Sequence, residues 1–173
     1  MNVQMSYMIL ALIIFTLLAL TFNQKGNSDL ETRLYHEAVV TVTEMGDALI
    51  NEISDLAFDE ILLSEKIKDK IKLTTAAKLG PEGAEHNKKT FNDVDDYNGF
   101  ELVEILEKLD TCRIEVTVNY IDLDNPDVKK IVPTWYKKVT VVIYNRKYLR
   151  KGDAEDPDLY EEVPVKLYYI KSY

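Results

Sequence analysis

The hydrophobic pattern begins with an apolar stretch at residues 5–22 that has no polar face. Only Ser6, Tyr7, Thr16 and Thr21 interrupt it, and no charged residue occurs among residues 1–24. A helix of roughly 18 apolar residues is at the lower end of what crosses a bilayer. In hydrocarbon, a helix satisfies its own backbone hydrogen bonds. The pattern therefore predicts one helix that needs apolar surroundings on every side.

Three interpretations of this stretch compete. A cleaved signal peptide needs basic residues before a shorter apolar core and small residues at its end, but nothing basic precedes residue 5 and residues 20–24 read Leu-Thr-Phe-Asn-Gln. A core helix of a water-soluble domain needs partners on all sides, which a terminal helix rarely has. We favour a retained membrane helix, or one buried among copies of itself, for residues 1–27.

A second helix is predicted for residues 28–63, where the pattern acquires a single apolar face. Ser28 and Glu31 form a capping box with Ser28 as N-cap, and Gly26 and Asn27 ahead of it predict a kink or short break. Apolar residues recur every three or four positions: Leu30, Leu34, Ala38, Val42, Met45, Leu49, Ile53 and Leu56. This stripe predicts that one face of the helix packs on a domain.

Residues 64–111 have a weaker pattern. Ile67, Ile71 and Leu73 among lysines allow one or two further helical turns, which residues 80–83 (Gly-Pro-Glu-Gly) end. Residues 87–98 are polar and acidic and predict a surface loop. Residues 102–109 fit a short helix and an extended segment equally well, so both remain open.

The period falls to two residues in the segment 112–173, which predicts an antiparallel sheet. Residues 112–120, 138–144 and 163–169 each alternate apolar and polar positions, as half-buried strands do. Pro164 cannot donate to a sheet ladder, so the third strand lies or begins at an edge. Strands in succession without intervening helices favour a meander. Burying its apolar face under the stripe of the long helix gives an α+β fold.

Composition excludes several classes of protein. The chain has 21 Lys+Arg against 30 Asp+Glu, a net charge of −9, which argues against a nucleic-acid partner because phosphate binding needs a concentrated basic surface. Cys112 is the single cysteine and fits a small buried hydrophobe. His36 and His86 have no recognisable Cys or Ser partner, and neither a phosphate loop nor zinc spacing occurs. We therefore expect no enzymatic activity.

Acidic residues gather in one segment that partly matches a calcium loop. Asp93 and Asp95 fall at its first and third positions and Glu104 at its twelfth, but Tyr97 stands at the fifth and Gly99 comes one place late. We favour the alternative of a solvated acidic turn and expect no resident cofactor. The weak calcium candidates are Asp93, Asp95, Asp96, Asn98 and Glu104, with a second and weaker set of Asp122, Asp124, Asn125 and Asp127.

The layout and three local motifs resemble the type IV pilins and the pseudopilins of type II secretion. Residues 47–60 (DALINEISDLAFDE) are similar to the helix end of minor pilins of the mannose-sensitive haemagglutinin type. Residues 91–100 (FNDVDDYNGF) are similar to an Asp-rich stretch of those proteins, and residues 137–142 (KKVTVV) to one of their strands. The resemblance covers most of the chain and implies polymerisation through the apolar helix.

Two departures from the family pattern bear on assembly. Pilin precursors carry a short basic leader, and none precedes Met1, so we expect either a mature chain or one that is not processed that way. The family usually has glutamate at the fifth mature position, where it neutralises a neighbour's N-terminal amine, whereas this chain has Gln4 and Met5. We expect the Gln4 side chain or backbone carbonyls to accept from the amine instead. The expected assembly residues are Met1, Gln4, Met5, Ile9, Leu12, Ile13, Leu17 and Leu20.

These patterns together predict a structural subunit of a cell-surface filament. Its apolar helix would lie in the membrane before assembly and among identical helices of a helical homopolymer afterwards. The alternative is a single-pass anchored domain, or a minor pseudopilin, that forms no long filament. Several tyrosines fit either an adhesive surface or ordinary half-buried strand positions: Tyr144, Tyr148, Tyr160, Tyr168, Tyr169 and Tyr173. The expected organisation is an apolar helix at 1–27, an amphipathic helix at 28–63, a variable region at 64–111 and a sheet at 112–173.

Overall fold

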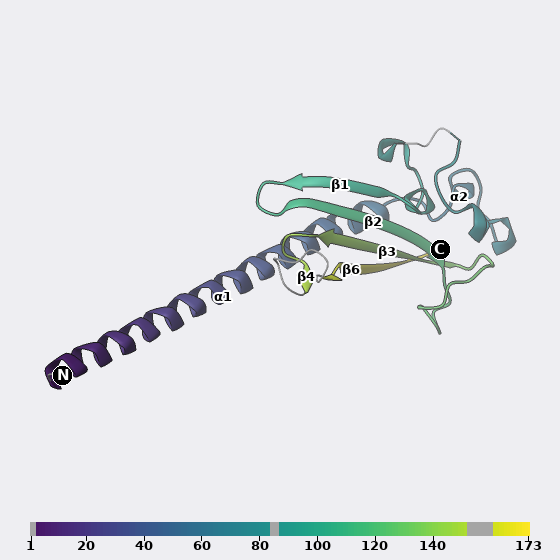
Figure 1. Ribbon diagram of the computed structural model, residues 1–173. Coiled ribbons are helices and arrows are strands. Elements are labelled where there is room, and N and C mark those ends of the chain that lie inside the picture. The colour runs from purple at the N-terminus through teal and green to yellow at the C-terminus, as the bar shows by residue number, and fades with distance from the viewer. Residues whose placement is uncertain (1–2, 84–86, 152–160) are drawn as a thin grey trace. The chain divides into compact units, whose positions relative to one another are not determined.

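The computed structural model describes residues 3–83, 87–151 and 161–173 (Figure 1). It divides into two units, Met1–Ala38 and Val39–Tyr173. The Met1 amine, His86 and Tyr160 lie outside the described residues. The helices are α1 (Val3–Ser54) and α2 (Ile61–Ser64), with 3-10 turns η1 (Lys70–Lys72), η2 (Ala76–Lys78), η3 (Lys88–Thr90) and η4 (Asp95–Tyr97). The strands are β1 (Glu101–Leu106), β2 (Asp110–Tyr120), β3 (Tyr136–Asn145), β4 (Arg150–Lys151), β5 (Glu161–Glu162) and β6 (Val165–Ser172).

Helix α1 is uninterrupted, so the predicted break near Gly26 is wrong. One glycine at an exposed helix position costs only about 1 kcal/mol relative to alanine, which the residues on both sides outweigh. The predicted end at residue 63 is also wrong, because α1 ends at Ser54. Beyond it the backbone turns to pair with a distant segment: the Ala57 N–H donates to the Asn92 carbonyl at 3.3 Å, and the Val94 N–H to the Ala57 carbonyl at 2.9 Å.

The sheet confirms the predicted antiparallel meander and adds a strand to it. Its order is β1-β2-β3-β6 (Figure 1), and every neighbouring pair is antiparallel. The segment left open by sequence is strand β1, and β6, which follows Pro164, is an edge strand as expected. Strands β4 and β5 form a separate two-stranded ladder.

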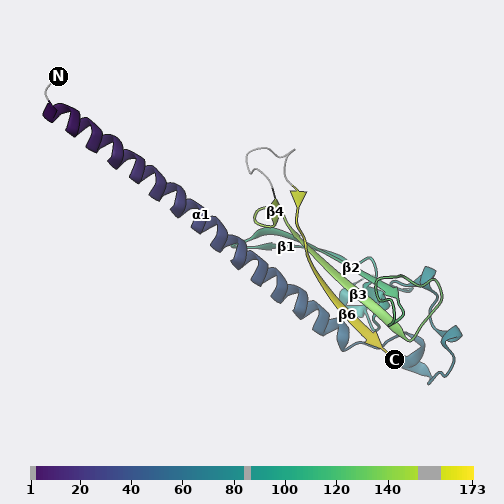
Figure 2. The same ribbon diagram turned by 90° about the horizontal axis from the view of Figure 1, so that it is seen from below.

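The core lies between the sheet and the last turns of α1, which run beside β6 in Figure 2. Alternate residues of β2 and β3 are buried, and the predicted helical stripe supplies Val42, Leu49 and Ile53 to the core. Gly46 belongs to the same face of the helix, where a Cβ would meet the Leu167 and Ile143 side chains. This packing establishes the predicted α+β class.

The acidic part of the segment 87–98 is not the surface loop that its polarity predicted, whereas Asn87, Lys89 and Thr90 are exposed as expected. Asp93, Asp95, Asp96, Val94 and Tyr97 are all buried. The Tyr97 ring meets two other aromatic rings edge-on, and its hydroxyl donates to Glu52 Oε1 at 2.8 Å. The prediction failed because Asp93 and Asp96 accept hydrogen bonds within the segment and Asp95 accepts from Lys137, which removes their need for water.

Candidate functional site

The apolar part of α1 is a continuous exposed surface. All side chains from Gln4 to Gly26 are exposed, and the predicted assembly residues from Met5 to Leu20 are between 49% and 66% exposed. The hydroxyls of Thr16 and Thr21 donate to the Ile13 and Leu18 carbonyls, each at 2.8 Å. Those two polar groups are therefore satisfied inside the helix and suit apolar surroundings. Among the described residues, one helix, Gln4–Ser54, contains a stretch long and apolar enough to cross a membrane.

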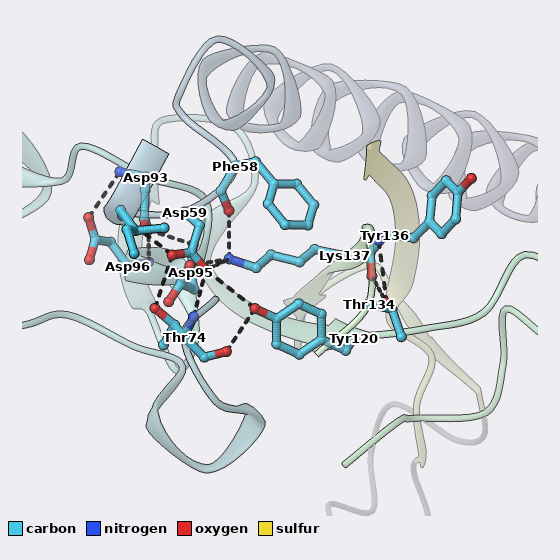
Figure 3. Close-up of polar contacts among 11 residues, drawn as sticks. Phe58, Asp59, Thr74, Asp93, Asp95, Asp96, Tyr120, Thr134, Tyr136 and Lys137 are labelled. Atoms are coloured by element: carbon cyan, nitrogen blue, oxygen red, sulfur yellow. Dashed lines mark hydrogen bonds and ion pairs between the residues drawn. The ribbon is translucent and has the colours of Figure 1, made fainter. Parts of the chain in front are cut away.

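A second site, which sequence reasoning missed, is centred on Lys137 of β3 (Figure 3). Its side chain is fully buried, and its Nζ donates to the Phe58 carbonyl at 2.5 Å and to Asp59 Oδ2 at 3.2 Å. Nζ also donates to Asp95 Oδ1. The rings of Phe58 and Tyr120 lie 4.7 Å and 5.4 Å from Nζ. An ammonium so enclosed needs paired carboxylates, because burying an isolated charge is costly.

Asp59 is held by donors from another segment. Asp59 Oδ2 accepts from the Thr74 N–H at 3.0 Å and from the Tyr120 hydroxyl at 3.3 Å, and Oδ1 accepts from the Thr74 hydroxyl at 3.2 Å. The Tyr120 hydroxyl also lies 2.8 Å from the Thr74 carbonyl. Burial raises the pKa of Tyr120, and the neighbouring Asp59 adds to the rise, so this hydroxyl remains a donor at neutral pH.

The remaining carboxylates bind the backbone of their own turn. Asp93 Oδ1 accepts from the Asp95 and Asp96 N–H groups at 2.9 Å and 3.2 Å. Asp96 Oδ2 accepts from the Asn92 and Asp93 N–H groups at 2.8 Å and 3.2 Å. Burial raises the pKa of Asp93 to about 8, with the negative charge of Asp95 adding to the effect. Burial also raises the pKa of Asp95, against the opposing charge of Lys137. A proton is therefore retained among these carboxyl groups at neutral pH.

The structure does not assemble the calcium candidates as a calcium loop. Asp93, Asp95 and Asp96 come together, but Glu104 is an exposed residue of β1 that pairs with Cys112. An extended strand places it roughly 16 Å beyond Gly99 at about 3.3 Å per residue. The Asn98 amide instead bridges the Leu79 carbonyl and the Val118 N–H, both at 2.9 Å. In the described parts of the chain, no group of three or more His, Cys, Asp and Glu residues is placed to hold a metal.

The weaker acidic set and the tyrosines have other surroundings. Asp122 pairs with Lys130 at 3.8 Å, and Asp127 pairs with Lys138 at 2.7 Å. Tyr168 is exposed beneath Lys138, whose Nζ lies 4.5 Å from its ring centre. Tyr173 stacks on Trp135 with ring centres 5.1 Å apart. The exposed Tyr168 and Tyr173 rings leave both interpretations of the tyrosines in place.

A groove lined by charged, polar and aromatic side chains lies at the β4 end of the sheet. It has a volume of about 450 Å³ and is lined by Val103, Asp110, Thr111, Arg113, Tyr144, Arg146, Lys147 and Glu162. The Arg113 guanidinium lies 4.1 Å from the centre of the Tyr144 ring and pairs with Glu115. These groups satisfy one another, so the groove does not present an unpaired Arg113 to a ligand.

The alternation of buried positions along β3 is the sequence signal that would have predicted the burial of Lys137. The buried residues Val139, Val141 and Ile143 have odd numbers, and Lys137 is in phase with them. Side chains two residues apart share one face of a strand, so the lysine had to point into the core.

Comparison of the chain with protein-family models, with curated proteins and with solved structures found no match.

Proposed function

We propose that this protein is the structural subunit of a type IV pilus-like filament at the cell surface. The observation that carries the proposal is the apolar run of α1, whose side chains are exposed from Gln4 to Gly26. Exposed apolar area of that extent marks a membrane or protein interface. A bilayer covers it before assembly, and the same helices of neighbouring subunits cover it afterwards.

The Val39–Tyr173 unit supports a filament in which the apolar helix makes the contacts between subunits and the folded domain faces water. It has its own core between helix and sheet, with Val42, Leu49 and Ile53 packed inside. The chain places its charged residues beyond residue 24, so the folded domain suits water while the apolar helix does not. Repetition of one such interface between identical subunits generates a helical polymer.

A second candidate function rests on the same helix. By length and composition, the stretch within Gln4–Ser54 is sufficient to cross a membrane once. A single-pass anchored domain, or a minor pseudopilin, would use it only as an anchor. Such a protein would need no contact between apolar helices, and this difference separates the two functions by experiment.

The test is a charge placed inside the apolar run. Leu12→Asp puts a carboxylate at a position that is 66% exposed in the isolated chain and would face apolar neighbours in a filament. An aspartate at the centre of a membrane helix costs about 2.5–3.5 kcal/mol on insertion scales. We expect filaments to be lost while the fluorescence of Trp135 and the circular dichroism of the domain stay unchanged.

Leu63→Asp is the matched control. Leu63 is a similarly exposed leucine, at 56%, but it belongs to α2 and lies outside the apolar run. We expect it to leave filament yield at the parent level. Normal filament yield from Leu12→Asp would overturn assembly through the apolar run. A parent chain that inserts into membranes but forms no filaments would favour the anchored domain.

A further inference from the structure

The lysine cluster places a buried amine against a buried carboxyl group in apolar surroundings. Lys137 Nζ lies 3.2 Å from Asp59 Oδ2, and both side chains are at most 1% exposed. A second carboxyl group, Asp95, also contacts Nζ. We propose that Lys137 and Asp59 condense to an intramolecular isopeptide bond, with Asp95 carrying the protons (Figure 3). This modification goes beyond the proposed function and does not depend on filament formation.

Two observations distinguish the roles of the carboxyl groups. Asp59 accepts from the Thr74 N–H, the Thr74 hydroxyl and the Tyr120 hydroxyl. Fixed donors of this kind stabilise the negative charge that develops on oxygen when a carbonyl carbon is attacked. Asp95 contacts Nζ directly through Oδ1, which is the position a proton carrier needs. Asp59 is therefore the electrophile and Asp95 the catalytic acid and base.

The apolar surroundings keep bulk water away from the reacting groups. The Phe58 and Tyr120 rings lie 4.7 Å and 5.4 Å from Nζ, and the Lys137 and Asp59 side chains are at most 1% exposed, so a newly formed amide is shielded from hydrolysis. Holding the two groups in contact replaces a bimolecular encounter, which is the largest entropic obstacle to their reaction.

The condensation balances within the three side chains. Asp95 accepts one proton from the Lys137 ammonium, and the neutral Nζ attacks Cγ of Asp59. A bond between Nζ and Cγ forms, and the bond between Cγ and one Asp59 oxygen breaks. Asp95 passes the two protons that Nζ loses, one after the other, to the departing oxygen, which leaves as water. Asp59 and Thr74 line a cleft of about 450 Å³ through which that water reaches solvent. The products are one amide and one water, with no change in total charge and no oxidant.

The bond would join two distant parts of the Val39–Tyr173 unit. Asp59 lies in the turn after α1 and Lys137 at the start of β3, 78 residues apart. A covalent link that closes so long a loop restricts the unfolded chain strongly. The cross-linked domain would therefore resist unfolding under tension or denaturant more than its hydrogen bonds alone permit.

Intact mass spectrometry of the purified unaltered chain is the direct test. We expect a mass lower than that of the linear sequence by one water molecule, and fragmentation of linked peptides that places the amide between Lys137 and Asp59. A mass equal to that of the linear sequence, or a link at another pair of residues, would overturn the proposal. This measurement needs no variant and so does not depend on a variant's folding.

Three variants test the roles of the residues. Asp59→Asn presents an amide that loses ammonia, so its cross-linked product is chemically identical to the parent product and has the same mass. Asp95→Ala removes the proton carrier, and we expect the mass of its linear sequence together with parent-like Trp135 fluorescence. Loss of water in Asp95→Ala would refute the role of Asp95, and a linear Asp59→Asn chain would refute the role of Asp59 as electrophile.

Lys138 is the matched control for Lys137. It is the next residue on the strand, it pairs with Asp127 at 2.7 Å, and it lies over the Tyr168 ring, but Asp127 is 91% exposed. An exposed pair keeps its charges in water and stays unreactive. We expect Lys138→Met to retain the full mass loss and Lys137→Met to abolish it. The opposite pattern would place the reaction at the exposed pair and overturn the proposal.

Discussion

Replacing Gly46 with valine tests how closely helix α1 approaches the sheet. A Cβ at position 46 would overlap the Leu167 Cδ1 and lie 3.2 Å from the Ile143 Cδ1. Leu167 lies on β6 and Ile143 on β3, so the helix meets both strands through the space that the glycine leaves. The substitution should push the helix away from the sheet or force both side chains out of their rotamers.

Two opposing effects set the size of the change. Glycine inside a helix costs about 1 kcal/mol relative to alanine, so any side chain at position 46 recovers part of that. Valine recovers less than alanine, because its β-branched side chain loses freedom in a helix. Extra carbon atoms in a filled core cost typically about 1–3 kcal/mol. We expect Gly46→Val to lower the free energy of unfolding by about 1–3 kcal/mol, since overpacking dominates.

The assay is urea denaturation of the full chain in mild detergent, followed by Trp135 fluorescence. Trp135 is the single tryptophan and stacks on Tyr173 within the folded domain, so its signal reports the unfolding of that domain. Gly26→Val is the matched control. The same change is made in the same helix, but a Cβ at Gly26 has nothing within 4 Å, and we expect the parent midpoint.

A double-mutant cycle identifies the clash. Leu167→Ala alone should destabilise the domain by removing core contacts, but it also opens the space that the introduced valine side chain needs. We expect the combined variant to be more stable than the sum of the two single effects predicts, by about 0.5–3 kcal/mol for residues in contact. Additive effects, or a Gly46→Val chain as stable as the parent, would refute the proposed close approach.

The other predictions concern the acidic turn and the N-terminus. Burial raises the pKa of Asp93 to about 8 from its ordinary 3.8, so the folded chain keeps a proton that the unfolded chain releases above about pH 4. The stability from this group is present below pH 4 and is lost as the pH rises to about 8. Asp93→Asn keeps the Oδ1 acceptor but has no proton to lose. Its urea midpoint should therefore fall less than the parent midpoint between about pH 5 and about pH 8. Equal falls in the two proteins would contradict the raised pKa of Asp93. At the N-terminus, we expect Gln4→Leu to reduce filament yield and Gln4→Glu to preserve or raise it, as counted in micrographs. Parent-like yield from both would show that position 4 does not recognise the amine.

Strands β2, β3 and β6 were predictable because their exposed and less exposed residues alternate with a period of two. Val116, Val141 and Leu167 stand opposite one another in the register, and each lies in phase with the apolar positions of its own strand. Pro164 marked the edge strand for a local reason, since it has no N–H to donate. These signals depend on residues that are near one another in sequence, so the sequence alone was sufficient to predict these strands.

Local signals predicted neither the continuity of helix α1 through Gly26 nor its end at Ser54. Gly26 is a weak breaker, and the helix passes through it. Ser54 ends the helix because Ala57 pairs with Asp93, a contact between segments far apart in sequence. Lys171 on β6 also donates to the Ser54 carbonyl at 2.5 Å, so the helix end is fixed by tertiary structure.

The acidic segment shows why polarity misled the prediction of burial. Asp93 and Asp96 satisfy their oxygens on neighbouring N–H groups, and Asp95 contacts Lys137. Lys137 is 42 residues away from Asp95 in the sequence, so no local sequence signal predicts this ion pair. The phase of Lys137 in β3 was present in the sequence, but its carboxylate partners become evident only when the fold is known.

Electron microscopy of the purified, unaltered chain after detergent removal tests the central claim most directly. If the exposed apolar run of α1 is an assembly surface, identical helices will bundle and the micrographs will show filaments with a helical repeat. If the helix serves only as an anchor, the chain will remain as single subunits in detergent and will form no ordered polymer when the detergent is withdrawn. Helical filaments are the result we predict, and dispersed monomers or amorphous aggregate would contradict it.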